Sequence, residues 1–230
     1  MVIVVAFLLS FVATGLQPII SKNEEVDKKK KILKSVVFVE ESREKEVFTQ
    51  DFVIDEYNNK IKELVVNYQG DPIEGKTAFE LDVKKEFRKP LDERQMPVFV
   101  YNDDGGKKYY IVPLIGMGLW DEISGYIALE DDMSTIKGAA FDHKGETPGL
   151  GAEISKTKFS ERFIGEEIFG EDGEYQFQVL KGTGNLKAEQ STYYIDGLSG
   201  ATLTIDGVNN MMNEILTDYT TFFDKVKSSS

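Results

Sequence analysis

The chain has 230 residues, enough for one well-packed core with appendages. Its 27 Lys and Arg against 40 Asp and Glu give a net charge of −13, which argues against a nucleic-acid or anionic-lipid partner, because both favour a basic face. The sequence contains no cysteine and one histidine, His143, so disulfides, thiolate catalysis, iron–sulfur ligation by this chain and multi-histidine metal sites are excluded.

The first twenty residues form an uncharged apolar segment. It is about as long as a bilayer-spanning helix needs, and no basic region precedes it as in a cleaved signal peptide, which is the alternative. We therefore expect an uncleaved transmembrane anchor over residues 1–20. A lysine-rich stretch, residues 22–34, follows directly. The positive-inside rule would place that stretch in the cytoplasm, so charge alone does not predict an exported domain.

A membrane-proximal helical region is expected over residues 21–93. Ser21 with Glu24 three residues later forms a capping box, which predicts a helix over 21–38. Apolar spacing predicts a second helix within 43–68, ended by Gly-Asp-Pro. The segment 77–87 is compatible with a strand, and residues 90–97 are typical of a linker.

The β-rich part begins at Val98 and belongs to a domain that we expect over residues 94–230. Segments rich in β-branched and aromatic residues, joined by short turns, predict an antiparallel sheet. They are 98–102 and 107–116 around the turn Asp103–Gly106, then 123–130 and 134–141. The predicted fold class is α+β, an N-terminal transmembrane helix followed by a soluble domain with an antiparallel sheet flanked by helices. The single Trp120 is expected in the core.

A glycine-rich loop follows the fourth of these strands. In His-Lys-Gly-Glu-Thr-Pro-Gly-Leu-Gly, residues 143–151, a proline and glycines bracket Thr147, so the backbone can approach a ligand closely. A purely structural turn is the alternative. We expect a helix in 152–168 and a strand over 174–181.

The most informative stretch is Asp-Gly-Leu-Ser-Gly-Ala-Thr-Leu-Thr, residues 196–204, between a strand-like segment, 191–195, and an amphipathic helix. Thr204 is expected to cap that helix, with Asp206 in its first turn. Free backbone N–H groups and the helix dipole favour a phosphate here, and Gly200 would let it approach closely. A turn and helix cap without a ligand is the alternative.

This stretch resembles the flavinylation motif, Asp-x-x-Ser/Thr-Gly-Ala-Thr, of the FMN-binding domain family. The anchor, Gly-Leu-Trp-Asp-Glu-Ile-Ser-Gly-Tyr-Ile-Ala-Leu at 118–129, the loop 143–151 and this motif also occur in the order found in one family. They resemble the NqrC subunits of the Na+-translocating NADH:quinone reductases and, more distantly, the RnfG subunits of the Rnf complexes.

The resemblance implies an electron-transfer flavoprotein with covalent FMN, joined through a phosphoester to Thr202 by a separate Mg2+-dependent flavin transferase after export. It implies a single-pass protein of the bacterial inner membrane with a periplasmic domain. Other subunits of the complex would be its partners. They would handle NADH, quinone and Na+, so this chain alone would hold no complete active site.

Residue roles also follow from the resemblance. Ser199, Gly200 and Ala201 would wrap the phosphate, and Asp196 would serve the transferase as a metal ligand during attachment. Thr204 is the second candidate for the attachment point. The loop residues expected around the flavin are Glu146, Thr147, Gly149, Leu150 and Gly151. Trp120 beside the flavin ring is the alternative to its place in the core. No catalytic residue and no resident metal are expected.

Two other functions remain open from the sequence. A flavoprotein of an Rnf-type or other extracytoplasmic electron-transfer chain would share the motif. A non-redox anchored binding domain, in which Ser-Gly-Ala-Thr only caps a helix, would carry no flavin.

Overall fold

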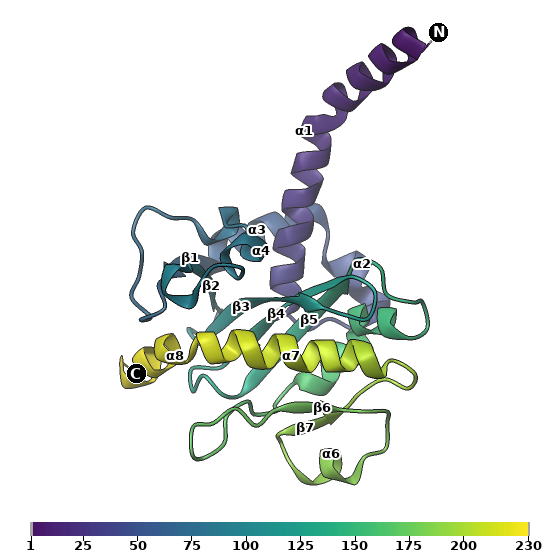
Figure 1. Cartoon of the computed structure of the whole chain (residues 1–230). Helices are drawn as coiled ribbons and strands as arrows, with labels where there is room; N and C mark the ends of the chain where they lie inside the picture. The colour runs from purple at the N-terminus through teal and green to yellow at the C-terminus, as the bar shows by residue number, and fades with distance from the viewer. Residues whose placement is uncertain (1, 230) are drawn as a thin grey trace.

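The computed structural model describes residues 2–229. Its first element is a single long helix, α1 (Val2–Lys34), which projects away from the rest of the chain (Figure 1). By length and composition this helix could cross a membrane, and none of its most apolar window is buried. The helix runs through Ser21 and ends at Lys34. The predicted helix is therefore confirmed over residues 21–34. Its predicted start at Ser21 and end at residue 38 are wrong, because the capping-box residues lie inside a continuous helix that ends at Lys34.

The last turns of α1 belong to the folded domain. Ile32 and Leu33 are fully buried, and α1 packs against α3 (Gln50–Lys60). The ammonium of Lys28 lies 4.5 Å from the centre of the Phe79 ring. The helix that leaves the domain is thus held in its core, without an intervening linker.

Five antiparallel strands form the main sheet, in the order β1-β2-β3-β4-β5. They are β1 (Ile61–Val66), β2 (Met96–Asn102), β3 (Lys108–Met117), β4 (Glu122–Leu129) and β5 (Ile136–His143). The predicted turn between the first two β-rich segments is confirmed, since Gly106 N donates to Asp103 O over 3.1 Å. The α+β class with an antiparallel sheet flanked by helices is confirmed.

The region predicted as helical contains one strand of this sheet. The helix predicted within 43–68 forms only as η1 (Glu41–Arg43), α2 (Glu44–Val47) and α3. Residues 61–66 are β1 instead, because Ile-Lys-Glu-Leu-Val-Val pairs with β2 and buries Val65 and Val66 there. The tertiary pairing overrides an apolar spacing that suits either structure.

The strand considered for 77–87 is also wrong. This segment contains η2 (Ala78–Glu80) and α4 (Val83–Glu86), because the Asp82 carboxylate accepts the Lys85 N–H and caps a helical turn. The predicted linker holds η3 (Leu91–Glu93) and the first residues of β2.

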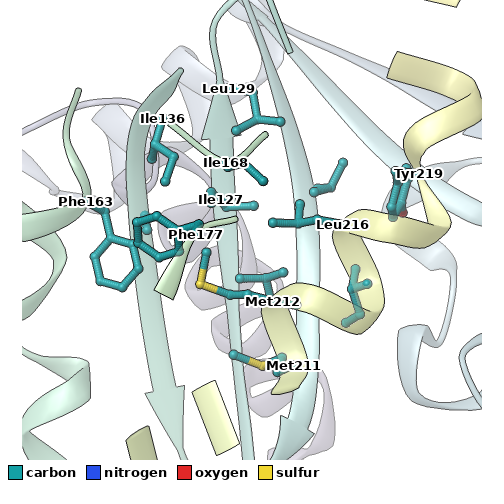
Figure 2. Packing of buried hydrophobic residues seen from close by; sticks show 14 of the residues in the cluster. Ile127, Leu129, Ile136, Phe163, Ile168, Phe177, Met211, Met212, Leu216 and Tyr219 are labelled. Carbon is teal, nitrogen blue, oxygen red and sulfur yellow. The ribbon is translucent and has the colours of Figure 1, made fainter. Parts of the chain in front are cut away.

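Two helices close the chain, α7 (Thr202–Asp218) and α8 (Thr220–Ser229). Figure 2 shows Met211, Met212 and Leu216 of α7 facing Ile127 and Leu129 of β4 in one core. A second core lies on the other sheet face, under α1 and α3, and includes Phe99, Ile111 and Ala128. The sheet therefore separates two apolar layers, with α7 on one side and α1 on the other (Figure 1).

Strands β6 (Gln178–Leu180) and β7 (Tyr194–Asp196) and helix α6 (Leu186–Gln190) lie below α7 in Figure 1. The short turns before them, η4 (Gly151–Ser155), α5 (Thr157–Ser160) and η5 (Glu161–Phe163), contact β5 instead. The helix predicted in 152–168 breaks into three short turns that end at Phe163. The strands predicted at 174–181 and 191–195 form as the shorter β6 and β7, which pair in parallel.

Candidate functional site

Three connections meet at the N-terminal end of α7. They are residues 118–121 between β3 and β4, residues 144–151 after β5, and residues 197–201 before α7. A Cβ added to Gly207 of α7 would lie 2.3 Å from the Met117 carbonyl oxygen, so the helix start contacts the end of β3. A Cβ added to Gly200 would lie 2.8 Å from Leu150 Cδ2, so the second and third connections also touch.

The Glu146 carboxylate joins these segments. Its Oε2 accepts a hydrogen bond from Thr204 Oγ1 over 2.6 Å, and its Oε1 accepts from the Trp120 N–H over 3.0 Å. Glu146 is only 5% exposed. A Cβ at Gly118 or Gly151 would lie 2.4 Å from one of its carboxylate oxygens, so both glycines make room for it. Glu146 therefore fixes the relative positions of two loops and a helix terminus.

Hydrogen bonding keeps Glu146 ionised despite its burial. Burial raises the pKa of this carboxyl, but the Thr204 hydroxyl and the backbone N–H groups of residues 119–121 outweigh it, so the pKa is lowered. The charge lies beside the first turn of α7, where the helix dipole favours an anion. His143 also contributes to this loop, because its Nδ1 accepts the Glu146 N–H over 3.3 Å.

Thr202 is the first residue of α7 and is exposed. Within residues 2–229 its hydroxyl makes no hydrogen bond, and the N–H groups of Thr202 and Leu203 donate to no atom of the chain. Gly200 has φ +76°, a conformation that favours glycine and turns the chain into the helix. An exposed hydroxyl thus stands among free N–H groups at a helix N-terminus, an arrangement that fits a phosphate group.

The predicted helix cap is wrong. Ala201 occupies the N-cap position without a side-chain hydrogen bond, and Thr204 lies inside the first turn. The Thr204 hydroxyl cannot cap because it donates to Glu146, and the residue is 1% exposed. Asp206 lies beyond the first turn and pairs with Lys181 at 3.2 Å.

Asp196 shapes the loop before the motif. Its carboxylate accepts the Gly184 N–H over 2.6 Å and the Asn185 N–H over 3.0 Å, and also binds the Asn185 amide. Partial burial raises the pKa of Asp196, but these bonds outweigh it and the pKa is lowered. Arg162 Nη1 donates to the Asp196 carbonyl over 2.9 Å.

Among residues 2–229 there is no group of three His, Asp or Glu able to hold a metal. The part of Asp196 in attachment stays a prediction.

The face around Thr202 is apolar and exposed. Trp120 is 68% exposed, so the expectation that it lies in the core is wrong. Among residues 2–229 its hydrogen bond is the one that its backbone N–H donates to Glu146. Other large exposed apolar side chains of the three connections and their flanks are Met117, Leu119, Leu150 and Leu203. A flat apolar group could cover them.

The loop after β5 holds the remaining predicted residues. The Thr147 carbonyl accepts the N–H groups of Leu150 and Ala152, each over 3.1 Å, and Gly149 has φ +76°. Thr147, Gly149 and Leu150 are exposed beside the start of α7, whereas Glu146 and Gly151 are buried beneath them. The sequence patterns did not indicate the roles of Gly118 and Gly207. Their only signals were a glycine just after the end of a predicted strand and a glycine inside a predicted helix.

Three comparisons with known proteins bear on this site. Residues 118–217 match the model of the FMN-binding domain family. The NqrC subunit of the Na(+)-translocating NADH-quinone reductase of Pseudomonas aeruginosa is 36% identical over 121 residues, which cover 53% of this chain and about half, 46%, of that relative. The Haemophilus ducreyi protein of the same name is 27% identical over 216 residues, covering 90% of this chain and 82% of the relative. The crystal structure of the NqrC subunit from Parabacteroides distasonis matches with a TM-score of 0.76 and 40% identity, covering 90% of this chain and 96% of that one.

Proposed function

Because this chain belongs to the NqrC family of the Na(+)-translocating NADH-quinone reductases, we propose that it is an electron-transfer subunit that carries FMN on Thr202 through a phosphoester. The observation that carries the proposal is the exposed, unpartnered Thr202 hydroxyl at the N-terminus of α7. The match of residues 118–217 to an FMN-binding domain supports the cofactor class.

The residues around Thr202 suit the two ends of FMN. The free N–H groups of the first turn of α7 would bind phosphate oxygens, and the ester to Thr202 Oγ1 would hold the group there. The exposed Trp120, Leu150 and Leu203 offer apolar surface for the isoalloxazine ring. FMN supplies the redox chemistry when bound, and the chain orients it and leaves an edge accessible.

Glu146 supports the site from below. Its carboxylate is buried and ionised, and it holds the Trp120 backbone and the Thr204 hydroxyl in place. It does not itself reach the surface that would face the flavin. Thr204 is buried and already bonded, which argues against it as the attachment point. Thr202 therefore remains the preferred acceptor.

The same proposal includes a membrane anchor and partner subunits. α1 would anchor the chain in the bacterial inner membrane, with the folded domain on the periplasmic side. A flavin transferase would attach FMN there, and the flavin would pass electrons from NADH towards quinone between other subunits of a sodium-pumping complex. An Rnf-type complex is the alternative assembly.

The test is the intact mass and in-gel flavin fluorescence of the full chain, exported and produced together with a flavin transferase. We expect the mass of the chain to rise by that of one FMN less one water, with the added mass on the peptide that contains Thr202. Thr202→Val should fold and lack the added mass, and Thr202→Ser should restore it in part. Covalent flavin on purified Thr202→Val, or none on the exported wild type, would overturn the assignment.

A further inference from the structure

A second site lies on the sheet face opposite α7. A cavity of about 240 Å³ opens between the end of α1, the segment 36–39, α2, strands β4 and β5, and α5. Small residues of two strands form its floor, Gly125 of β4 with Gly138 and Ala140 of β5, and Tyr126 stands opposite Ala140. The five-stranded sheet separates this cavity from the core under α7.

The cavity presents hydrogen-bonding groups that the fold leaves unused. The half-buried Tyr126 lines it, and within residues 2–229 its hydroxyl has no hydrogen-bond partner. Lys31 beside it is already neutralised by Asp27 at 2.8 Å and Asp142 at 2.7 Å. The Tyr126 hydroxyl is therefore a free donor beside this cavity.

Two further lysines add positive charge. Lys30 and Lys137 line the cavity, are half-buried, and form no ion pair in the described part of the chain. The Lys137 ammonium lies 5.1 Å from the centre of the Tyr109 ring, outside the cavity lining, so it would turn from that ring towards a ligand. The nearby Glu44 carboxylate is occupied by Lys34 and by the Thr157 hydroxyl, although Lys30 helps to lower its pKa. The lining holds four lysines and four carboxylates, those of Asp27, Glu44, Asp142 and Glu161. Lys30 and Lys137 are the cations left to meet a single negative charge, and the carboxylates would repel a doubly charged phosphate.

The remaining lining is apolar. The Phe48 ring lies under Lys30 at 5.8 Å, and the rim carries Phe38, 55% exposed, and Ile164, 43% exposed. The volume of the cavity equals that of about eight water molecules in the liquid. It therefore suits a ligand of roughly eight to ten heavy atoms. A flat apolar body between Phe48 and Tyr126 fits this lining.

We propose that this cavity binds a small aromatic monocarboxylate, with its carboxylate at Lys30 and Lys137, its ring between Phe48 and Tyr126, and the Tyr126 hydroxyl as a further donor. The site is independent of FMN, because it lies on the other face of the sheet. Its position at the junction of α1 and the sheet would couple ligand binding to the docking of the anchor helix.

The test uses saturation-transfer NMR of benzoate with the full chain in nanodiscs, and empty nanodiscs as the blank. Saturable binding of benzoate is expected. The dissociation constant should be at least about tenfold larger for neutral benzamide with the wild type, and for benzoate with the double variant Lys30→Gln/Lys137→Gln. Ala140→Leu should fill the floor and abolish binding, and Tyr126→Phe should weaken it. Lys156→Gln, a surface lysine outside the cavity, should change nothing.

Circular dichroism and melting temperature check that each variant is folded. If the double lysine variant fails to fold, the comparison of benzoate with benzamide on the wild type still tests whether the cavity prefers a negative charge. Equal affinity for the two compounds, benzoate binding retained in folded Ala140→Leu, or no saturable binding to the wild type would overturn the proposal.

Discussion

The Thr204 hydroxyl and the Glu146 carboxylate form a 2.6 Å hydrogen bond between residues 58 positions apart in the sequence. The bond fixes the first turn of α7 to the loop after β5. Both side chains are buried, so water cannot replace either partner without a penalty. The surface that Thr202 presents depends on this contact, because the same carboxylate also holds the Trp120 backbone.

A double-mutant cycle should reveal this coupling. Thr204→Val and Glu146→Gln should each destabilise the fold, and their combined effect should fall short of the sum by about 1.5–3 kcal/mol, the range for hydrogen bonds to charged groups. Urea unfolding of the four proteins measures it. Thr217→Val, whose hydroxyl bonds to Asn213 on an exposed surface, is the control and should have little effect. Additive effects of the two mutations would contradict the role given to this bond.

The same carboxylate should make stability depend on pH. The pKa of Glu146 is lower in the folded chain than the ordinary 4.5, so the folded state binds fewer protons than the unfolded state on acidification. Its stabilising contribution is present above pH 4.5 and is lost as pH falls through the folded pKa. The stability difference between wild type and Glu146→Gln should therefore shrink below pH 4.5. A difference that stays constant down to acid unfolding would contradict the lowered pKa.

Gly200 and Gly149 provide a matched pair of glycines. Both have φ +76°, but only at Gly200 would a Cβ meet another atom, Leu150 Cδ2 at 2.8 Å. Each change to Ala should cost about 1–2 kcal/mol in backbone strain, with an added cost for Gly200→Ala. Adding Leu150→Ala should relieve that extra cost, but should give no relief to Gly149→Ala. Thermal unfolding measures stability, and flavin fluorescence reports attachment. Equal effects of the two glycine substitutions would show that the contact with Leu150 is unimportant.

Leu33 should test whether α1 belongs to the folded core. Leu33 is fully buried, whereas Leu16 on the same helix is 46% exposed. Leu33→Ala should destabilise the domain by about 2–5 kcal/mol, the cost of a cavity in a packed core. Leu16→Ala is the control and should change domain stability by less than about 0.5 kcal/mol. Both are measured by denaturant unfolding in the same detergent. Similar stability of the two variants would mean that α1 is a loosely attached tether.

The sequence predicted the strands after residue 98 well, because alternating β-branched residues and short turns are local signals. It failed at residues 61–66, where the apolar spacing suits a helix or a strand and only pairing with β2 decides. It also failed at residues 77–87, where the Asp82 cap outweighs a strand-like composition.

At the site, the motif around Thr202 correctly predicted where the helix begins. The roles of the neighbouring residues could not be predicted from the sequence. Thr204 has the composition of an N-cap, and only the position of Glu146 in the fold shows that its hydroxyl is used elsewhere. Trp120 is exposed against the usual tendency of tryptophan. It lies in the connection between β3 and β4, and among residues 2–229 its hydrogen bond is the one from its backbone N–H to Glu146. Contacts between distant segments decided both cases.

Glu166 should give stability an opposite pH dependence. Its Oε2 is buried without a hydrogen-bond partner among the described residues, and burial, with the charge of Glu167, raises its pKa to about 7. Between pH 4.5 and 7 the folded state therefore binds more protons than the unfolded state, so this group lowers stability as pH rises. Glu166→Gln keeps a neutral side chain of similar shape. It should match the wild-type melting temperature at pH 4 and exceed it at pH 8. The exposed Glu171→Gln is the control and should follow the wild type at both values. A Glu166→Gln variant that is less stable than the wild type at pH 8 would show that the carboxylate has a stabilising partner after all.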